Sequence, residues 1–135
     1  MHKAVKEKVA QRANFRCEYC FTPVDFSPDP FSIDHIMPKS VILDDDLENL
    51  AFCCLGYNNY KHKAQEVVDP LSGAITDIYN PRKDNWADHF QWESSMLKIE
   101  GITPLGRATV NRLQLNRPGL VNLRRLLHQF GYSAT

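Results

Sequence analysis

A short strand that ends beside a carboxylate and an imidazole is the feature of this sequence that most restricts its fold. The segment from Phe31 to Ile36 is rich in β-branched and aromatic residues. Pro38 ends it, because proline has no N–H to donate a further hydrogen bond between strands. Adjacent side chains of a regular strand point to opposite faces, which would separate Asp34 from His35. We expect the strand end before Pro38 to relax this alternation, so that Asp34 turns toward a metal while His35 addresses a water molecule.

A helix is expected next, from Asn58 to about Gln65. Asn58 and His62 are four residues apart and so share one helix face, where an amide oxygen and an imidazole nitrogen could complete a metal site with Asp34. Oxygen ligands suit Mg²⁺ or Mn²⁺, and a histidine ligand moves the preference toward Mn²⁺, Ni²⁺ or Zn²⁺.

The remaining polar residues of this region are expected to serve the same site. Lys61 and Lys63 would lie on the helix surface and bind phosphate, and the amide of Asn49 would orient the backbone or the imidazole near His35. Oxygen ligands for a cation, a base for water and a side chain that holds the base are what a one-metal phosphodiesterase needs. The joint pattern favours a nuclease, although each residue taken alone is more often structural, the asparagines as helix caps or turn residues.

The four cysteines are Cys17, Cys20, Cys53 and Cys54. A Cys-x-x-Cys pair with a later cysteine indicates structural zinc rather than a disulfide in a reducing compartment, so Cys17, Cys20 and Cys54 are candidate zinc ligands. The fourth ligand of a tetrahedral site would fall three residues after Cys54, where the chain has Tyr57. The alternative is that the cysteines stay reduced and pack as small apolar groups.

Charge is segregated along the 135 residues, although the formal net charge is zero. Residues 1–16 hold five cations against one acid, and residues 101–135 hold five arginines and no acid, so the middle is strongly acidic. Basic ends around a central metal site fit a DNA-binding protein, while solvated helix faces are the plainer interpretation. No apolar run approaches the roughly 20 residues of a membrane span, and the amino terminus lacks a secretory apolar block, so we expect a cytoplasmic protein without membrane association.

The other segments predict an α+β protein. We expect a basic amphipathic helix over residues 2–13, a hairpin over 66–79 and a strand pair over 89–93 and 96–100. Thr103 and Pro104 open a helix to about Leu115, and Pro118 opens a last helix. The leucines of these two helices would face a core or a partner. Their arginines, with Arg107 and Arg112 as candidate DNA contacts, would lie outside.

Four segments together resemble the HNH endonuclease family with paired Cys-x-x-Cys knuckles: 16–20, 33–38, 48–50 and 54–61. Residues 80–110 look like the extension of a bacterial, often cyanobacterial, branch of small HNH proteins. The resemblance implies one nuclease domain over 1–135, with a ββα-metal core at about 12–66 and an extension at about 67–135. It also implies metal-dependent cleavage of DNA phosphodiesters, with His35 as general base, Asp34 and Asn58 as metal ligands and Asn49 as the middle motif residue.

Two positions depart from the family pattern. Tyr57 replaces the last knuckle cysteine, and a Tyr hydroxyl, with an ordinary pKa near 10, is a poor substitute for a thiolate. His62 stands where many relatives with paired knuckles have glycine, and its placement is similar to the second helix histidine of colicin-type nucleases. A non-catalytic nucleic-acid-binding module is the alternative function, and a leucine-mediated interaction domain is a third. A monomer would nick DNA, whereas a homodimer could cut both strands.

Overall fold

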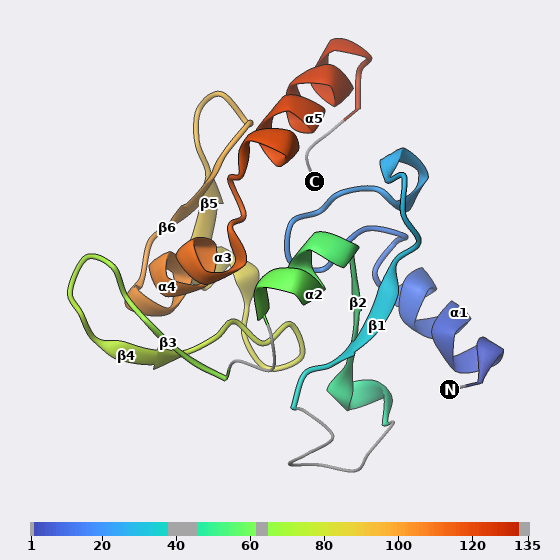
Figure 1. Ribbon diagram of the computed structural model, residues 1–135, viewed down its shortest axis with the longest axis horizontal. Helices are drawn as coiled ribbons and strands as arrows, with labels where there is room; N and C mark the ends of the chain where they lie inside the picture. The colour runs from blue at the N-terminus through green and yellow to red at the C-terminus, as the bar shows by residue number, and fades with distance from the viewer. Residues whose placement is uncertain (1, 38–45, 62–64, 133–135) are drawn as a thin grey trace. The chain divides into compact units, whose positions relative to one another are not determined.

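The computed structural model describes residues 2–37, 46–61 and 65–132 of the chain (Figure 1). The chain forms two compact units, one made of residues 1–63 with 80–82 and the other of residues 64–79 with 83–135. The expectation of one domain with a core over 12–66 stays a prediction. No helix in the described part of the chain is both long enough and apolar enough to cross a membrane.

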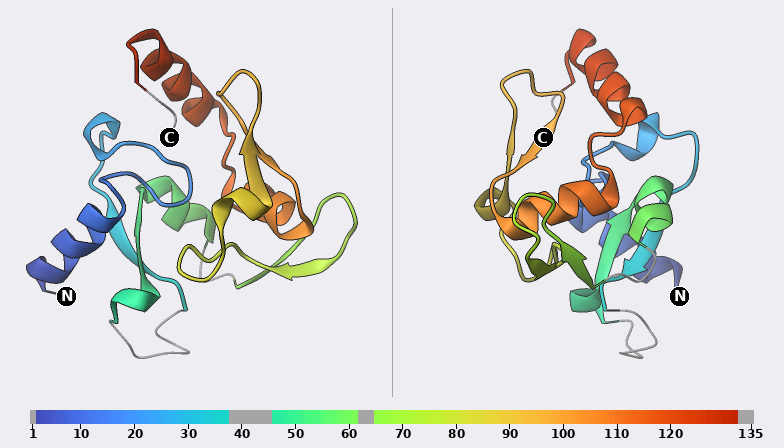
Figure 2. Two further views of the ribbon diagram at one scale, coloured as in Figure 1. Left: turned by 180° about the vertical axis from the view of Figure 1, so that it is seen from behind. Right: turned by 60° about the vertical axis from the view of Figure 1, so that its left-hand side comes forward.

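The first unit is built on an antiparallel pair of strands. Strand β1 (Ser32–His35) pairs with β2 (Leu50–Cys53), with Asp34 opposite Ala51 and His35 opposite Leu50. Helix α1 (Lys3–Arg12) lies on one side of this pair and helix α2 (Leu55–Lys61) on the other, as the views in Figures 1 and 2 agree. Two 3-10 turns, η1 (Val24–Phe26) and η2 (Leu47–Asn49), complete the unit.

The core between α1 and the strands explains why the amino-terminal helix forms. Val5 and Val9 are four residues apart on one helix face, and they pack with the buried Leu50 and Phe52 of β2. Arg12, at the end of the same helix, donates hydrogen bonds to the carbonyl oxygens of Leu47 and Leu50, at 2.9 and 2.6 Å. The helix is therefore joined to the start of β2 by both apolar and polar contacts.

The second unit contains two further hairpins and three helices. Strand β3 (Glu66–Val68) pairs with β4 (Ile75–Asp77), and β5 (Phe90–Trp92) pairs with β6 (Ile99–Gly101), both antiparallel. The helices are α3 (Trp86–His89), α4 (Pro104–Leu113) and α5 (Pro118–Gln129). Thr103 caps α4 by accepting a hydrogen bond from the Gly106 N–H, as its position before Pro104 predicts.

Two features fix the interior of this unit. Gly101 of β6 lets that strand meet the backbone of α4, because a Cβ at Gly101 would overlap the backbone N of Arg107. A Cβ at Gly106 would likewise overlap the carbonyl oxygen of His89. The fully buried Asp69 accepts two hydrogen bonds from Arg107, at 2.9 and 3.0 Å, and further bonds from Ser72. The Arg107 hydrogen bonds lower the pKa of Asp69 well below its ordinary value.

The mixed helix and strand composition predicted from the sequence is confirmed, with small two-stranded sheets among the described residues. Both predicted hairpin regions and the two carboxy-terminal helices form close to their expected limits. The sequence did not indicate strand β2, because all four of its side chains are buried and it therefore lacks the alternation of a half-buried strand. Helix α2 begins at Leu55 rather than at Asn58, and the short helix α3 was not expected.

One expectation about exposure in the second unit is wrong. Arg124, expected on the outside of the last helix, is buried and donates to the carbonyl oxygens of Leu97 and Leu115 while lying 5.2 Å from the Trp92 ring centre. Arg107 pairs with the buried Asp69 and keeps 28% of its side chain exposed. Both guanidinium groups satisfy local acceptors in the second unit, which the charge pattern alone could not show.

Candidate metal and nuclease site

Asp34, the carboxylate at the end of β1, faces helix α2. One of its oxygens, Oδ2, accepts a hydrogen bond of 3.0 Å from the Tyr57 hydroxyl and lies 2.6 Å from the Lys61 ammonium. The side chain of Asp34 is 14% exposed and that of Lys61 is 4% exposed, so this is a nearly buried ion pair. Among the described residues, no hydrogen bond reaches the other carboxylate oxygen, Oδ1, which leaves that oxygen for a cation.

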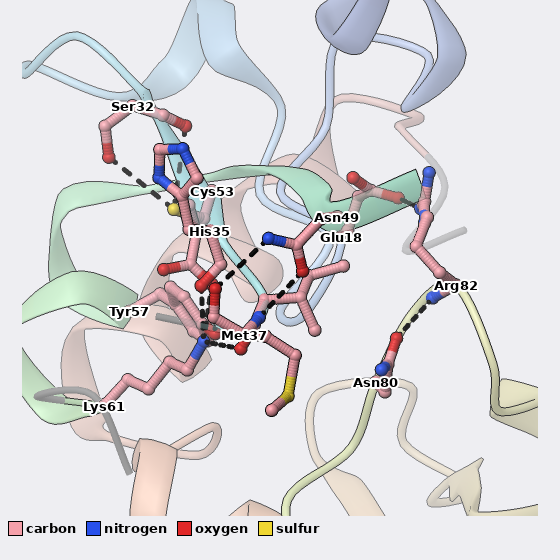
Figure 3. A network of polar contacts seen from close by, with 12 residues as sticks. Glu18, Ser32, His35, Met37, Asn49, Cys53, Tyr57, Lys61, Asn80 and Arg82 are labelled. Atoms are coloured by element: carbon pink, nitrogen blue, oxygen red, sulfur yellow. Dashed lines mark hydrogen bonds and ion pairs between the residues drawn. The ribbon is translucent and has the colours of Figure 1, made fainter. Parts of the chain in front are cut away.

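Lys61 lies in the interior of the first unit, which contradicts its expected place on the helix surface. Its ammonium group also lies 3.2 Å from the carbonyl oxygen of Ile36 and 3.5 Å from that of His35 (Figure 3). Three acceptors around one ammonium tie the end of β1 to the last turn of α2. A direct phosphate contact by Lys61 stays a prediction.

The remaining candidate residues on the helix cannot be placed beside Asp34. Asn58 is part of α2, but its side chain, like His62 and Lys63, lies outside the described residues. Their roles as metal or phosphate ligands therefore stay predictions.

His35 keeps its place in the regular ladder of β1. It pairs with Leu50, and the next N–H, of Ile36, donates to the carbonyl oxygen of Asn49 at 2.9 Å. The expected relaxation of the strand end is thus not found, and the alternation of side chains continues through His35. The imidazole belongs to the α1 side of the strand, where His35, Ile33 and Phe31 line a cavity of about 550 Å³.

Asn49 clamps the backbone two residues beyond His35. Its side-chain oxygen accepts from the Met37 N–H at 2.9 Å, and its side-chain nitrogen donates to the Met37 carbonyl oxygen at 3.1 Å (Figure 3). Two opposed hydrogen bonds from one side-chain amide hold both backbone polar groups of Met37. This is the backbone-orienting geometry that the sequence led us to expect, while a catalytic role for Asn49 stays a prediction.

Three cysteines of the first unit, two from the Cys-x-x-Cys turn and one before α2, form a buried cluster. The sulfur atoms of Cys17, Cys20 and Cys54 all lie within 4.8 Å of one another, and those of Cys20 and Cys54 are 3.7 Å apart. Sulfur ligands at about 2.3 Å from a tetrahedral zinc are separated by about 3.8 Å, which agrees with that distance. The three residues are close enough to hold a metal ion.

Protons on these thiols oppose metal binding. Burial raises the pKa of Cys17 well above its ordinary value, and hydrogen bonds with the neighbouring thiols add to this effect. The metal-free thiols of Cys17 and Cys20 are therefore protonated at neutral pH, and an ion that binds them must displace their protons.

Tyr57, at the position of the missing fourth cysteine, is directed elsewhere. Its ring stacks on that of Tyr19, with centroids 3.7 Å apart and planes 11° from parallel, and its hydroxyl donates to Asp34. Burial raises the pKa of Tyr57 well above its ordinary value, so the phenol stays neutral and acts as a donor. In this geometry the cluster offers three sulfur ligands, and the tyrosine serves the carboxylate of β1 instead.

Cys53 is separated from the cluster although it adjoins Cys54. Its sulfur contacts the hydroxyl and the carbonyl oxygen of Ser32, each at 3.6 Å, on the opposite strand. Burial raises its pKa above that of an ordinary thiol. The separation follows from strand alternation, because Cys53 ends β2 and Cys54 begins the turn into α2.

Sequence reasoning missed a second clamp, formed by Glu18 inside the Cys-x-x-Cys turn. Its carboxylate accepts from the Phe52 N–H at 2.8 Å and pairs with Arg82, whose own N–H donates to the Asn80 side chain (Figure 3). The clamp holds the turn against β2 through residues far apart in the sequence. Glu18 and Arg82 carry opposite charges, but their separation of 64 residues left no local signal.

The expected DNA-binding arginines occupy different environments. Arg107 is paired with Asp69, whereas Arg112 is exposed on α4. DNA contacts by Arg107 and Arg112 stay predictions.

Comparison with known proteins gives one match. Residues 17–64, about a third of the chain, match the family model described as HNH endonuclease. The match confirms the resemblance drawn from the sequence, and the matched segment contains the cysteine cluster, β1, β2 and α2. No curated protein and no solved structure matches the chain.

Proposed function

We propose that this chain is a metal-dependent DNA endonuclease that hydrolyses phosphodiester bonds. The observation that carries the proposal is the HNH match over 17–64, the segment in which β1, β2 and α2 follow one another and bring Asp34, His35 and Asn49 to one strand end. That order supports a ββα-metal core. DNA is the partner, and HNH proteins as a class act on it.

In the proposed reaction, His35 takes a proton from water as the water oxygen attacks phosphorus. The bond from phosphorus to the 3′ oxygen breaks and that oxygen takes a proton from solvent, which leaves a 5′-phosphate and a 3′-hydroxyl. Asn49 positions the peptide of Met37 and thereby the strand end that carries His35. Lys61 and Tyr57 hold the Asp34 carboxylate in place through Oδ2.

The proposed cation, Mg²⁺ or Mn²⁺, would be held by Asp34 together with Asn58 and His62. The open Oδ1 of Asp34 and the oxygen-rich donor set fit a hard divalent ion, and a histidine would also admit Ni²⁺ or Zn²⁺. When bound, such an ion supplies charge stabilisation to the leaving 3′ oxygen.

One observation favours a second function, a non-catalytic nucleic-acid-binding module. The same carboxylate oxygen of Asp34 is already bound by an ammonium and a hydroxyl, which satisfies much of its charge without a metal. A protein that kept this ion pair for stability alone could retain the fold and bind DNA without cutting it.

Incubation with supercoiled plasmid separates the two functions. With Mg²⁺ or Mn²⁺ we expect nicked or linear DNA, and with excess chelator we expect the plasmid to stay supercoiled. Nicked product indicates an acting monomer, and linear product formed directly indicates a dimer. A gel shift without cleavage under every metal condition would establish the binding module instead.

We also propose that Cys17, Cys20 and Cys54 hold structural zinc, with a ligand other than Tyr57 in the fourth position. Replacement of Cys17 by serine should reduce bound zinc from about one equivalent to nearly none, because two thiolates remain. Cys53→Ser is the matched control, since its sulfur contacts Ser32, and it should keep its zinc. Metal analysis of the purified proteins measures both, and equal zinc in the two variants, or none in the unmodified chain, would contradict the assignment.

A further inference from the structure

The cavity beside His35 has a basic wall that the nuclease chemistry described above does not use. Lys3 and Lys6 of α1 line it, together with Glu7 and the aromatic side chains of Phe31 and Phe52. Lys3 and Lys6 are three residues apart and therefore share one face of the helix. Within the described part of the chain neither lysine takes part in an ion pair, so both ammonium groups are available to an anion.

Charge and shape in this cavity agree on the kind of ligand. Two ammonium groups face a single lining carboxylate, Glu7, which leaves the wall positive. The rings of Phe31 and Phe52 lie 4.9 Å apart behind it and provide an apolar surface. A volume of about 550 Å³ is in the range of pockets that take small organic ligands.

We propose that this cavity binds one nucleotide unit of the DNA strand that is cleaved beside His35, with Lys3 and Lys6 holding its phosphates and Phe31 contacting the sugar and base. The inference rests on the proposed function, which it deepens by assigning the strand-binding surface to the amino-terminal helix. His35 lines the same cavity, so a nucleotide bound there adjoins the phosphate at which His35 activates water. Phosphate contacts position a strand without reading its sequence, so binding here is independent of base order.

The test uses a variant that removes both lysine charges, Lys3→Gln with Lys6→Gln. Its control, Lys8→Gln with Lys98→Gln, loses the same charge from two exposed lysines that do not line the cavity. Binding to a short DNA duplex is measured in chelator, so that no cleavage occurs, over a series of salt concentrations. Each lost phosphate contact should make the slope of log affinity against log salt shallower by about 0.9, hence by nearly two in the cavity variant and by little in the control.

Kinetics with metal provide the second readout. The cavity variant should raise KM about tenfold and leave kcat unchanged, because the lysines bind substrate and transition state alike. Glu7→Gln, which removes the only lining carboxylate among the described residues, should act in the opposite direction and tighten DNA binding. A gain in affinity cannot result from misfolding.

The outcomes separate this inference from the proposed function. An unmodified protein that cleaves DNA, with equal salt slopes in the cavity and control variants, would overturn the cavity site and leave the nuclease proposal standing. A protein that binds DNA with the expected slopes but never cleaves would support the site and overturn the catalytic proposal. Absence of DNA binding by the unmodified protein would overturn both.

Discussion

Replacement of His35 by alanine is expected to lower the rate of plasmid cleavage by about 100- to 10,000-fold, the range over which a positioned general base accelerates proton transfer. The loss should fall on kcat, because alanine cannot accept the proton of the attacking water. DNA binding should survive, since the lysines of the cavity and the backbone of β1 stay in place. The rate is measured from the conversion of supercoiled plasmid at saturating metal.

His128→Ala is the matched control for this experiment. His128 lies on α5, in the second unit, and its Nε2 atom is buried without a hydrogen-bond partner among the described residues. The change therefore removes an imidazole without breaking a hydrogen bond of that atom. It should cleave at the unmodified rate. If His35→Ala cleaves as fast as this control, the base has been assigned to the wrong residue.

Replacement of Asp34 by alanine is expected to destabilise the fold by roughly 3–5 kcal/mol, the usual cost of leaving one member of a buried ion pair without its partner. Lys61 is only 3% exposed and would keep its charge in the interior without the carboxylate that balances it. The Tyr57 hydroxyl would lose its acceptor as well. Urea denaturation measures the free energy of unfolding.

A double variant distinguishes the ion pair from other effects of the substitution. Adding Lys61→Met to Asp34→Ala removes the unpaired charge and fills its volume, so the double variant should be more stable than Asp34→Ala alone. Asp25→Ala, an exposed aspartate in the turn η1, should stay within about 0.5 kcal/mol of the unmodified chain. Equal instability of the single and double variants would show that the ion pair is not what Asp34 contributes.

Asp34 is both the ion-pair partner of Lys61 and a candidate metal ligand, so the two roles need separate experiments. Loss of cleavage in Asp34→Ala would not by itself indicate a metal ligand, because the strand end and helix α2 are also released. Asp34→Asn keeps an oxygen acceptor for Lys61 and Tyr57 while it removes the negative charge that a divalent ion needs. Metal titration of this variant, followed by calorimetry, reports on ligation separately from folding.

Much of the secondary structure could be predicted from the sequence because its signals are local. Val5 and Val9 form one apolar helix face, the hairpin over 66–79 turns at Pro70 and Gly73, and Thr103 with Pro104 opens a helix. Each of these depends on residues within a few positions of one another. Strand β2 has no such local signal, because α1 and α2 lie on its two sides and every position is apolar.

The chemical character of the site was also present in the sequence. The identities and spacing of Asp34, His35 and Asn49, with the cysteines around them, were sufficient to indicate the resemblance to HNH endonucleases that the family match over residues 17–64 confirms. The cysteine cluster follows from the same spacing. Residue type and local order are properties of the chain itself, so no coordinates were needed for these conclusions.

Only the tertiary structure decided which groups meet. Lys61 reaches Asp34 across 27 residues, Tyr57 turns from the cysteine cluster to the same carboxylate, and the regular ladder keeps His35 on the face of α1. Charge pattern predicted Lys61 and Arg124 at the surface, yet both are buried because acceptors from distant segments surround them. Local sequence determines helices, turns and the chemistry a segment carries, whereas the partner of a charged group depends on distances in space that only the packed chain sets.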